Sequence, residues 1–293
     1  MSAEVRVRAP GKVNLYLAVG PVDEVGYHPL ATVFQALDIA DDIVVRPSDE
    51  LALSMPGTDL PVDETNLAIR AAKALAAHAG IEPRADIEIT KRIPIQGGMA
   101  GGSADAAGTL LALDALWQLD TPESELLEIA ASLGADVPFI LIGGTALGTR
   151  RGDIITPIDA SGDYTWILIT QTEGHSTPAA FRLFDAAAPV DLVQPEVRRE
   201  FLDALAVGDV GGVVRSARND LAWICLQNHA GARAAAEVCD ALGVPYMVSG
   251  SGPTIAALCE SGDPEALRSE LERRLPSTTC LIAHGPAPGA RVV

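Results

Sequence analysis

Four glycines within six residues, at positions 97–102, constrain the fold of this chain more than any other stretch. The alternating residues Ala85 to Thr90 predict a strand before them, and an alanine- and leucine-rich run to about Trp117 predicts a helix after them. Glycines let backbone N–H groups converge, and a helix N-terminus adds unpaired N–H groups and a positive dipole end. The stretch predicts a phosphate site, although glycines that serve packing alone give the same pattern.

This glycine run differs from the two commonest nucleotide-binding loops. A Walker A loop ends in Gly-Lys-Ser/Thr, whereas here Gly102 is followed by Ser103 and Ala104. The Rossmann spacing G-x-G-x-x-G is missing as well. We therefore expect phosphate binding by a loop of another class.

The charge of the chain argues against several kinds of partner. With a formal net charge of −18 over 293 residues, the surface repels nucleic acid and anionic membranes, and we expect neither as a partner. The sequence lacks an apolar run of the roughly 18 residues that a membrane helix needs, and it lacks the apolar segment of a signal peptide, so we expect a cytoplasmic protein. An anionic substrate would have to be held by a few local cations.

Two polar pairs near the N-terminus are candidate site residues. Lys12 and Asn14 share one face of an apolar strand that follows Pro10-Gly11. A lysine at a strand start is most often only solvated, so the pair alone does not establish a site. Tyr27 and His28 follow a turn glycine; they could stack on and hydrogen-bond a planar base, or they could simply complete a loop.

Two later segments each leave two interpretations open. Asp136, before Val137-Pro138, could cap a short helical turn, or its carboxylate could accept a proton or orient a hydroxyl group. Gly250-Ser251-Gly252-Pro253 lies between two short apolar strands. It could form a hairpin-like turn, or a second glycine loop that closes over the first.

The remaining pattern predicts an α+β chain with two domains. Val5 to Arg8 predicts a strand separate from the one at Lys12, and residues 30–46 suit one or two strands with Asp41-Asp42 as a turn. Residues 66–79 predict a helix capped by Asp63 or Thr65. Beyond residue 150 the charged, glycine-poor helices contrast with the first half. We therefore expect a nucleotide-binding domain over residues 1–150 and a second domain over residues 151–293.

Three motifs, in their order and rough spacing, resemble those of the GHMP kinases, the superfamily named after galactokinase, homoserine kinase, mevalonate kinase and phosphomevalonate kinase. They read A-P-G-K-V-N-L-Y-L at 9–17, P-I-Q-G-G-M-A-G-G-S-A-D-A-A at 94–107 and S-G-S-G-P-T at 249–254. Within the superfamily, G-Y-H, N-L-A-I-R-A-A and L-G-A-D-V-P-F resemble the family that phosphorylates a cytidine-linked methylerythritol on the route to isoprenoids. The match spans nearly the whole chain and is patchy between residues 170 and 244.

This resemblance implies a fold and an activity. It implies an α+β, two-domain GHMP kinase fold with the active site in the cleft between the domains. The activity implied is phosphorylation of an alcohol, the 2-hydroxyl of the cytidine-linked substrate, with ATP as Mg-ATP. No protein ligand of magnesium is implied, because phosphate oxygens and water are expected to supply most of its ligands.

The resemblance also implies site residues. Asp136 would accept or orient the proton of the substrate hydroxyl, and Lys12 would steady that carboxylate and the transferring phosphoryl group. The residues implied for ATP are Asn66, Leu67, Pro94, Gly97, Gly98, Met99, Ala100, Gly101, Gly102, Ser103 and Ala104. Those implied for the second substrate are Asn14 and Thr177 near its sugar-like part, Tyr27 and Phe181 as the two faces of a cytosine stack, and His28 at the cytosine edge.

Three positions depart from the family pattern. Ala104 replaces a serine, Val25 replaces an acidic residue, and Ala100 replaces a glycine, so Ala100 must keep φ negative or tolerate strain. Three rival interpretations are a homoserine- or mevalonate-type kinase, a decarboxylase of the same superfamily, and a non-catalytic nucleotide-binding protein. A homoserine- or mevalonate-type kinase would have no use for the cytosine-stacking residues. A decarboxylase would release carbon dioxide. A non-catalytic protein would not need the Lys12 and Asp136 pair. The sequence does not give the oligomeric state.

Overall fold

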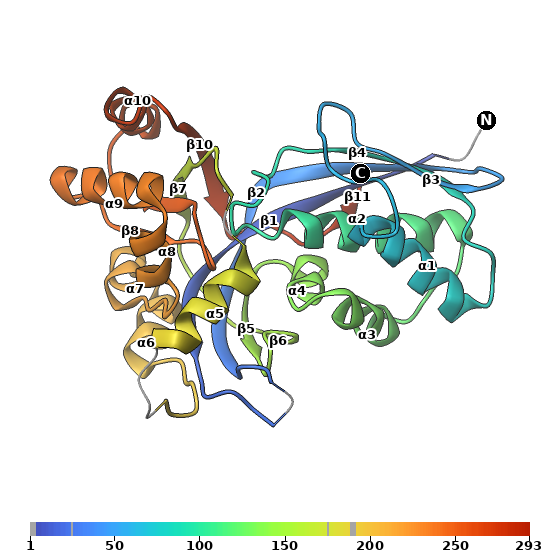
Figure 1. Ribbon diagram of the computed structural model, residues 1–293, viewed down its shortest axis with the longest axis horizontal. Helices are drawn as coiled ribbons and strands as arrows, with labels where there is room; N and C mark the ends of the chain where they lie inside the picture. Colours follow the sequence, from blue (N-terminus) through green and yellow to red (C-terminus); the bar gives the residue numbers. More distant parts are fainter. Residues whose placement is uncertain (1–3, 25, 175, 188–191) are drawn as a thin grey trace.

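The computed structural model describes residues 4–24, 26–174, 176–187 and 192–293, so Val25 lies outside the described residues. The strands of this part of the chain form a larger mixed sheet and a smaller antiparallel sheet, each covered by helices (Figure 1). Among the residues described, none of the helices is long and apolar enough to cross a membrane.

The larger sheet has the strand order β11-β1-β2-β4-β3, and β5 and β6 extend it from the other end of β2. Its strands pair antiparallel, except that β3 runs parallel to β4. The strands are β1 (Val5–Val19), β2 (Leu30–Arg46), β3 (Leu51–Ser54), β4 (Ala85–Thr90), β5 (Thr145–Thr149), β6 (Ile154–Pro157) and β11 (Arg291–Val292).

Two predictions about the long strands are wrong. The two N-terminal strands are one strand, β1, which continues past Pro10-Gly11 with a shift of register against β2 between Pro10 and Lys12. The Asp41-Asp42 turn lies inside β2. Asp41 is fully buried, and its carboxylate accepts the N–H groups of Arg92 and Ile93, so a distant partner overrides the turn preference of the Asp-Asp pair.

Helices α1 (Leu67–Ala79), α2 (Gly101–Trp117), α3 (Glu123–Leu133) and α4 (Val137–Ile142) lie together beside the larger sheet (Figure 1). The predicted helix before Gly80 is confirmed, but Asn66 caps it, accepting the N–H of Ala68, rather than Asp63 or Thr65. The predicted strand, glycine loop and helix are confirmed as β4, the loop and α2. A Cβ on Gly108 would lie 2.5 Å from Ile43, so α2 depends on this glycine to approach β2.

The smaller sheet has the order β10-β7-β9-β8, and the helices of the C-terminal half lie beside it (Figure 1). Its strands are β7 (Tyr164–Thr170), β8 (Tyr246–Val248), β9 (Ile255–Leu258) and β10 (Thr279–Gly285). The helices are α5 (Thr177–Ala187), α6 (Arg199–Val207), α7 (Val210–Ser216), α8 (Ala222–Asn228), α9 (Ala230–Leu242) and α10 (Pro264–Arg274).

The two sheets share one hydrophobic core, because buried side chains of β7 pack in the same cluster as those of β1 and β2. Buried Trp166 donates its indole N–H to Gln35 of β2 at 3.2 Å, and the N–H of Leu17 in β1 donates to Arg218 at 2.6 Å. Strands β6 and β11 come from beyond residue 150 and lie in the larger sheet. The division of the chain at residue 150 stays a prediction.

Candidate active site

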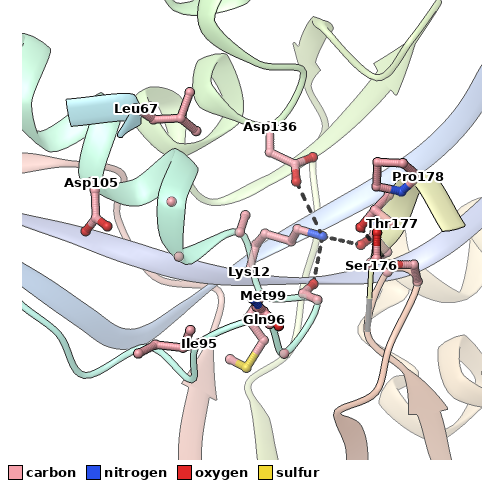
Figure 2. Close-up of a pocket in the computed structure, with 18 of the residues that line it drawn as sticks. Lys12, Leu67, Ile95, Gln96, Met99, Asp105, Asp136, Ser176, Thr177 and Pro178 are labelled. Carbon is pink, nitrogen blue, oxygen red and sulfur yellow. Dashed lines mark hydrogen bonds and ion pairs between the residues drawn. The ribbon is translucent and has the colours of Figure 1, made fainter. Parts of the chain in front are cut away.

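A pocket of about 570 Å³ lies where β1, the glycine loop, the start of α4 and the start of α5 meet (Figure 2). Thirteen of the predicted site residues line it, and they come from the nucleotide, catalytic and substrate groups alike. They are Lys12, Asn14, Asn66, Leu67, Gly97, Gly98, Met99, Ala100, Gly101, Gly102, Asp136, Thr177 and Phe181. One pocket thus contains predicted site residues that are up to 169 positions apart in the chain, from Lys12 to Phe181.

Lys12 is buried in β1 and points toward Asp136 (Figure 2). Its Nζ donates to Asn14 Oδ1 at 2.7 Å and to the carbonyl oxygen of Gly98 at 3.0 Å, and it lies 3.8 Å from Asp136 Oδ2. Burial lowers the pKa of Lys12, and attraction to the Asp136 carboxylate opposes that shift. The interpretation of Lys12 as merely solvated is wrong.

Asp136 immediately precedes α4, but within the described residues its side chain makes no capping hydrogen bond to that helix. The side chain is one-third exposed (33%) and lines the pocket. The carboxylate is thus held near the lysine and open to a ligand, instead of being used as a cap. A carboxylate in this position can accept a proton from a bound hydroxyl group.

The glycine loop, residues 97–102, packs against the second glycine-rich segment, residues 249–253. Ser249 Oγ donates to the carbonyl oxygen of Gly98 at 3.1 Å, and Gly250 and Ser251 line the same pocket. Thr177, at the start of α5, hydrogen-bonds Ser251 Oγ at 2.8 Å. Residues 250–253 are therefore both the hairpin turn between the antiparallel strands β8 and β9 and a second glycine loop that closes over the first.

Close packing explains the glycine at position 98. Its φ is +76°, and a Cβ there would lie 2.2 Å from the carbonyl oxygen of Ser249 and 2.8 Å from that of Gly252. Ala100 has a φ of +59°, so the loop accepts a left-handed alanine where the family usually has glycine. The strain considered from the sequence is therefore present, at the residue just before α2.

We expect Gly98→Ala to abolish nucleotide binding and to lower the free energy of unfolding by about 3 kcal/mol or more, because backbone atoms must move. Gly57→Ala is a matched control: Gly57 has a φ of +79°, and a Cβ added there would meet no atom within 4 Å. It should cost only about 1 kcal/mol, from the left-handed backbone alone. Equal losses in urea unfolding of the two variants would contradict the packing argument.

A buried ionic cluster of Asp41, Lys91 and Asp105 lies next to the glycine loop and was missed in the sequence. Lys91 Nζ contacts Asp41 Oδ2 at 2.5 Å and Asp105 Oδ2 at 2.8 Å, and it donates to the carbonyl oxygen of Gly101 at 3.1 Å. Burial, together with repulsion from Asp41, raises the pKa of Asp105 to about 7, against the attraction of Lys91. The cluster ties β2 and β4 to the first turn of α2.

The aromatic end of the pocket differs in detail from the expectation. Phe181 lines the pocket, and its ring stacks on that of His28, with centroids 5.5 Å apart. Both nitrogens of His28 have partners: Nδ1 lies 2.7 Å from the carbonyl oxygen of Gly20 and Nε2 lies 2.7 Å from Asp185 Oδ1. A base could bond His28 only by displacing one of them. Tyr27 is half-exposed (52%) and lies outside the pocket lining.

Three nucleotide-site residues also lie outside the lining, namely Pro94, Ser103 and Ala104. Ala104 is on the buried face of α2, fully within the core, which places its methyl group away from a ligand in the pocket. The lining also includes residues that we did not predict: Leu60, Pro61 beside Asn66, and Arg151, which contacts Tyr27. Leu60 and Pro61 belong to an ordinary loop, and Arg151 is one of two adjacent arginines, so neither pattern predicts a site.

The described residues contain no group of three or more histidine, cysteine, aspartate or glutamate side chains that could hold a metal ion. Any magnesium in the pocket would therefore rely on ligands other than such a cluster. Asp136 is the pocket carboxylate that is open to a ligand, because Lys91 pairs with Asp105.

Comparison with known proteins gives a consistent result. A model of the GHMP kinases N terminal domain matches residues 66–144. A 4-diphosphocytidyl-2-C-methyl-D-erythritol kinase from Nocardioides sp. is 43% identical and covers 98% of this chain and 99% of its own. A crystal structure of 4-(cytidine 5'-diphospho)-2C-methyl-D-erythritol kinase is 31% identical, with a TM-score of 0.76 over 96% of this chain and 99% of that one. A homoserine kinase from Cytophaga hutchinsonii, 19% identical, covers 99% of this chain and 97% of its own with a TM-score of 0.73, and so shares the fold alone.

The fold and the pocket define a small-molecule kinase of the GHMP class, with an α+β architecture. This confirms the kinase activity and the resemblance inferred from the three motifs. More narrowly, the chain belongs to the 4-diphosphocytidyl-2-C-methyl-D-erythritol kinase family.

Proposed function

We propose that this pocket transfers the γ-phosphoryl group of ATP to the 2-hydroxyl of 4-diphosphocytidyl-2-C-methyl-D-erythritol, in the methylerythritol phosphate route to isoprenoids. The observation that carries the proposal is that the Lys12 and Asp136 pair shares one pocket with the glycine loop and Phe181. Full-length relatives with this activity in their names support it.

The nucleotide end would hold Mg-ATP. The glycine loop and the N-terminus of α2 line this end and offer unpaired backbone N–H groups, while Asn66 and Leu67 border it. Gly98 and Gly101 let the loop pack closely against its neighbours, because a Cβ at either one would meet protein atoms, and this packing fixes the loop that would hold the phosphates. ATP supplies the phosphoryl group to be transferred, and magnesium neutralises part of its charge.

Asp136 and Lys12 would act on the substrate hydroxyl. The hydroxyl oxygen forms the new bond to phosphorus as the bond to the ADP oxygen breaks, and Asp136 takes the hydroxyl proton. Lys12, fixed by Asn14 and the Gly98 carbonyl group, stabilises the carboxylate and the charge on the transferring group. Because phosphoryl transfer needs little covalent help from a protein, positioning and charge can account for the catalysis.

The opposite end would take the cytidine. Phe181 lines this end and Tyr27 lies beside it, so a cytosine ring could stack on these aromatic side chains. His28 would bond the cytosine edge after release from Asp185, and Asn14 and Thr177 would border the methylerythritol part.

We further propose that the enzyme is cytoplasmic and has no nucleic-acid or membrane partner. The net charge of −18 supports the absence of such partners, because nucleic acid and membrane surfaces are themselves anionic.

The test is ADP release by the purified protein with Mg-ATP, comparing 4-diphosphocytidyl-2-C-methyl-D-erythritol with mevalonate and homoserine. We expect turnover with the cytidine compound alone and no release of carbon dioxide. Turnover with mevalonate or homoserine alone would contradict the cytidine site but leave the nucleotide end intact. Absence of turnover with all three, despite tight ATP binding, would contradict the catalytic roles of Lys12 and Asp136.

A further inference from the structure

Among the described residues, the pocket contains three cationic side chains: Lys12, Lys91 and Arg151. The two lysines are almost fully buried and each lies against carboxylates, Lys12 against Asp136 and Lys91 against Asp41 and Asp105. Arg151 differs, because its side chain is 43% exposed. Among these three, it is therefore the cation most open to a diffusing anion.

Arg151 is held in place rather than free in solvent. Its guanidinium carbon lies 5.1 Å from the centroid of the Tyr27 ring, in a cation–π contact. Its Nη2 lies 3.2 Å from Oδ2 of buried Asp153, and its backbone N–H donates to Oδ1 of the same residue at 3.2 Å. A guanidinium group has five N–H donors, so the aspartate and the ring leave donors for a ligand.

The position of Arg151 relates it to the second substrate. It contacts Tyr27 and lines the same pocket as Phe181, the two aromatic residues proposed for cytosine. In a cytidine diphosphate group the phosphates follow directly on the ribose, so they lie near the base-binding end. Since the whole chain repels anions, a local planar cation that can bond phosphate oxygens in pairs is the side chain this site needs.

On this geometry, and resting on the proposed function, we propose that Arg151 binds the diphosphate of the cytidine substrate. Arg151 is thus a specificity residue for nucleoside diphosphates over nucleosides. Asp153 positions the guanidinium group, which lies over the ring of Tyr27. The reaction steps at Asp136 do not involve Arg151.

The test measures calorimetric binding of cytidine, cytidine diphosphate and ATP to the wild-type protein and to Arg151→Gln. We expect the wild type to bind cytidine diphosphate about tenfold or more tightly than cytidine. In Arg151→Gln this preference should fall to about twofold, while cytidine and ATP affinities change by less than about twofold. In turnover, KM for the cytidine substrate should rise about tenfold with kcat nearly unchanged.

Arg150→Gln is the matched control. Arg150 is the neighbouring arginine, is exposed and does not line the pocket, so the same loss of charge should leave the diphosphate preference intact. A retained preference in Arg151→Gln, or an equal loss in both variants, would overturn the proposal for Arg151 alone. If Arg151→Gln lowered the affinity for ATP as much as that for cytidine diphosphate, Arg151 would be a contact of the ATP phosphates, and the proposal would be wrong. A wild-type protein that binds neither cytidine ligand would contradict the proposed function itself.

Discussion

Asp136→Asn is expected to lower turnover about 100- to 10,000-fold while ATP affinity changes less than about threefold. The amide keeps the shape of the side chain but cannot take the hydroxyl proton. The fold should tolerate it, because the Asp136 side chain makes no capping hydrogen bond in the described structure and is one-third exposed. Single-turnover rates and equilibrium ATP binding on the same preparation separate the two effects.

Glu128→Gln is the control for Asp136→Asn, since Glu128 is an exposed carboxylate of α3 outside the pocket. It should keep wild-type turnover. Lys12→Met should also lose turnover, and combining it with Asp136→Asn should add little, because the two groups act on the same transfer. Two results would contradict the assignment of the catalytic pair. One is a loss of ATP affinity in Asp136→Asn as large as its loss of rate. The other is a double variant whose loss of turnover equals the product of the losses in the two single variants.

Local patterns were sufficient where one stretch of chain decides the geometry. The strand, glycine loop and helix over residues 85–117 are confirmed, because alternation, glycines and small helical residues act on near neighbours. The spacing of two between Lys12 and Asn14 placed both on one strand face, and both line the pocket. The order of three motifs then identified the superfamily, which the comparisons confirm.

Pairings across long stretches of sequence could not be predicted in this way. Asp41 was assigned to a turn because its partner, Lys91, is 50 residues away. Likewise, the bond from His28 to Asp185 joins residues 157 positions apart, and it occupies a nitrogen that was expected to face a base. Arg151 gave no signal as one of two adjacent arginines; its place in the pocket lining and its contact with Tyr27 distinguish it from Arg150. A charged residue shows its role only when its partner is known.

The Asp41, Lys91 and Asp105 cluster should have the largest effect on stability. We expect Lys91→Met to lower the free energy of unfolding by about 3–5 kcal/mol at pH 8, because it leaves two buried carboxylates facing each other without a cation. Lys73→Met is the control: Lys73 pairs with Glu64, both side chains are largely exposed, and the loss should stay below about 1 kcal/mol. Urea unfolding followed by circular dichroism measures both.

A second variant keeps this prediction testable if Lys91→Met fails to fold. Adding Asp105→Asn removes one of the two charges, so the double variant should recover more than half of the lost stability. Failure of the second substitution to restore any stability would show that Lys91 acts through its packing and its bond to Gly101, rather than through its charge.

The pH dependence gives the cluster an independent signature. Burial raises the pKa of Asp105 from 3.8 to about 7, so between about pH 4 and pH 7 the folded protein keeps a proton that the unfolded chain has lost. The free energy of unfolding therefore falls across this window as the pH rises. Asp105→Asn should lack that contribution, and the deficit of Lys91→Met should be smaller at pH 5 than at pH 8, because Asp105 is then protonated. A deficit that is equal at the two pH values would contradict the charge argument.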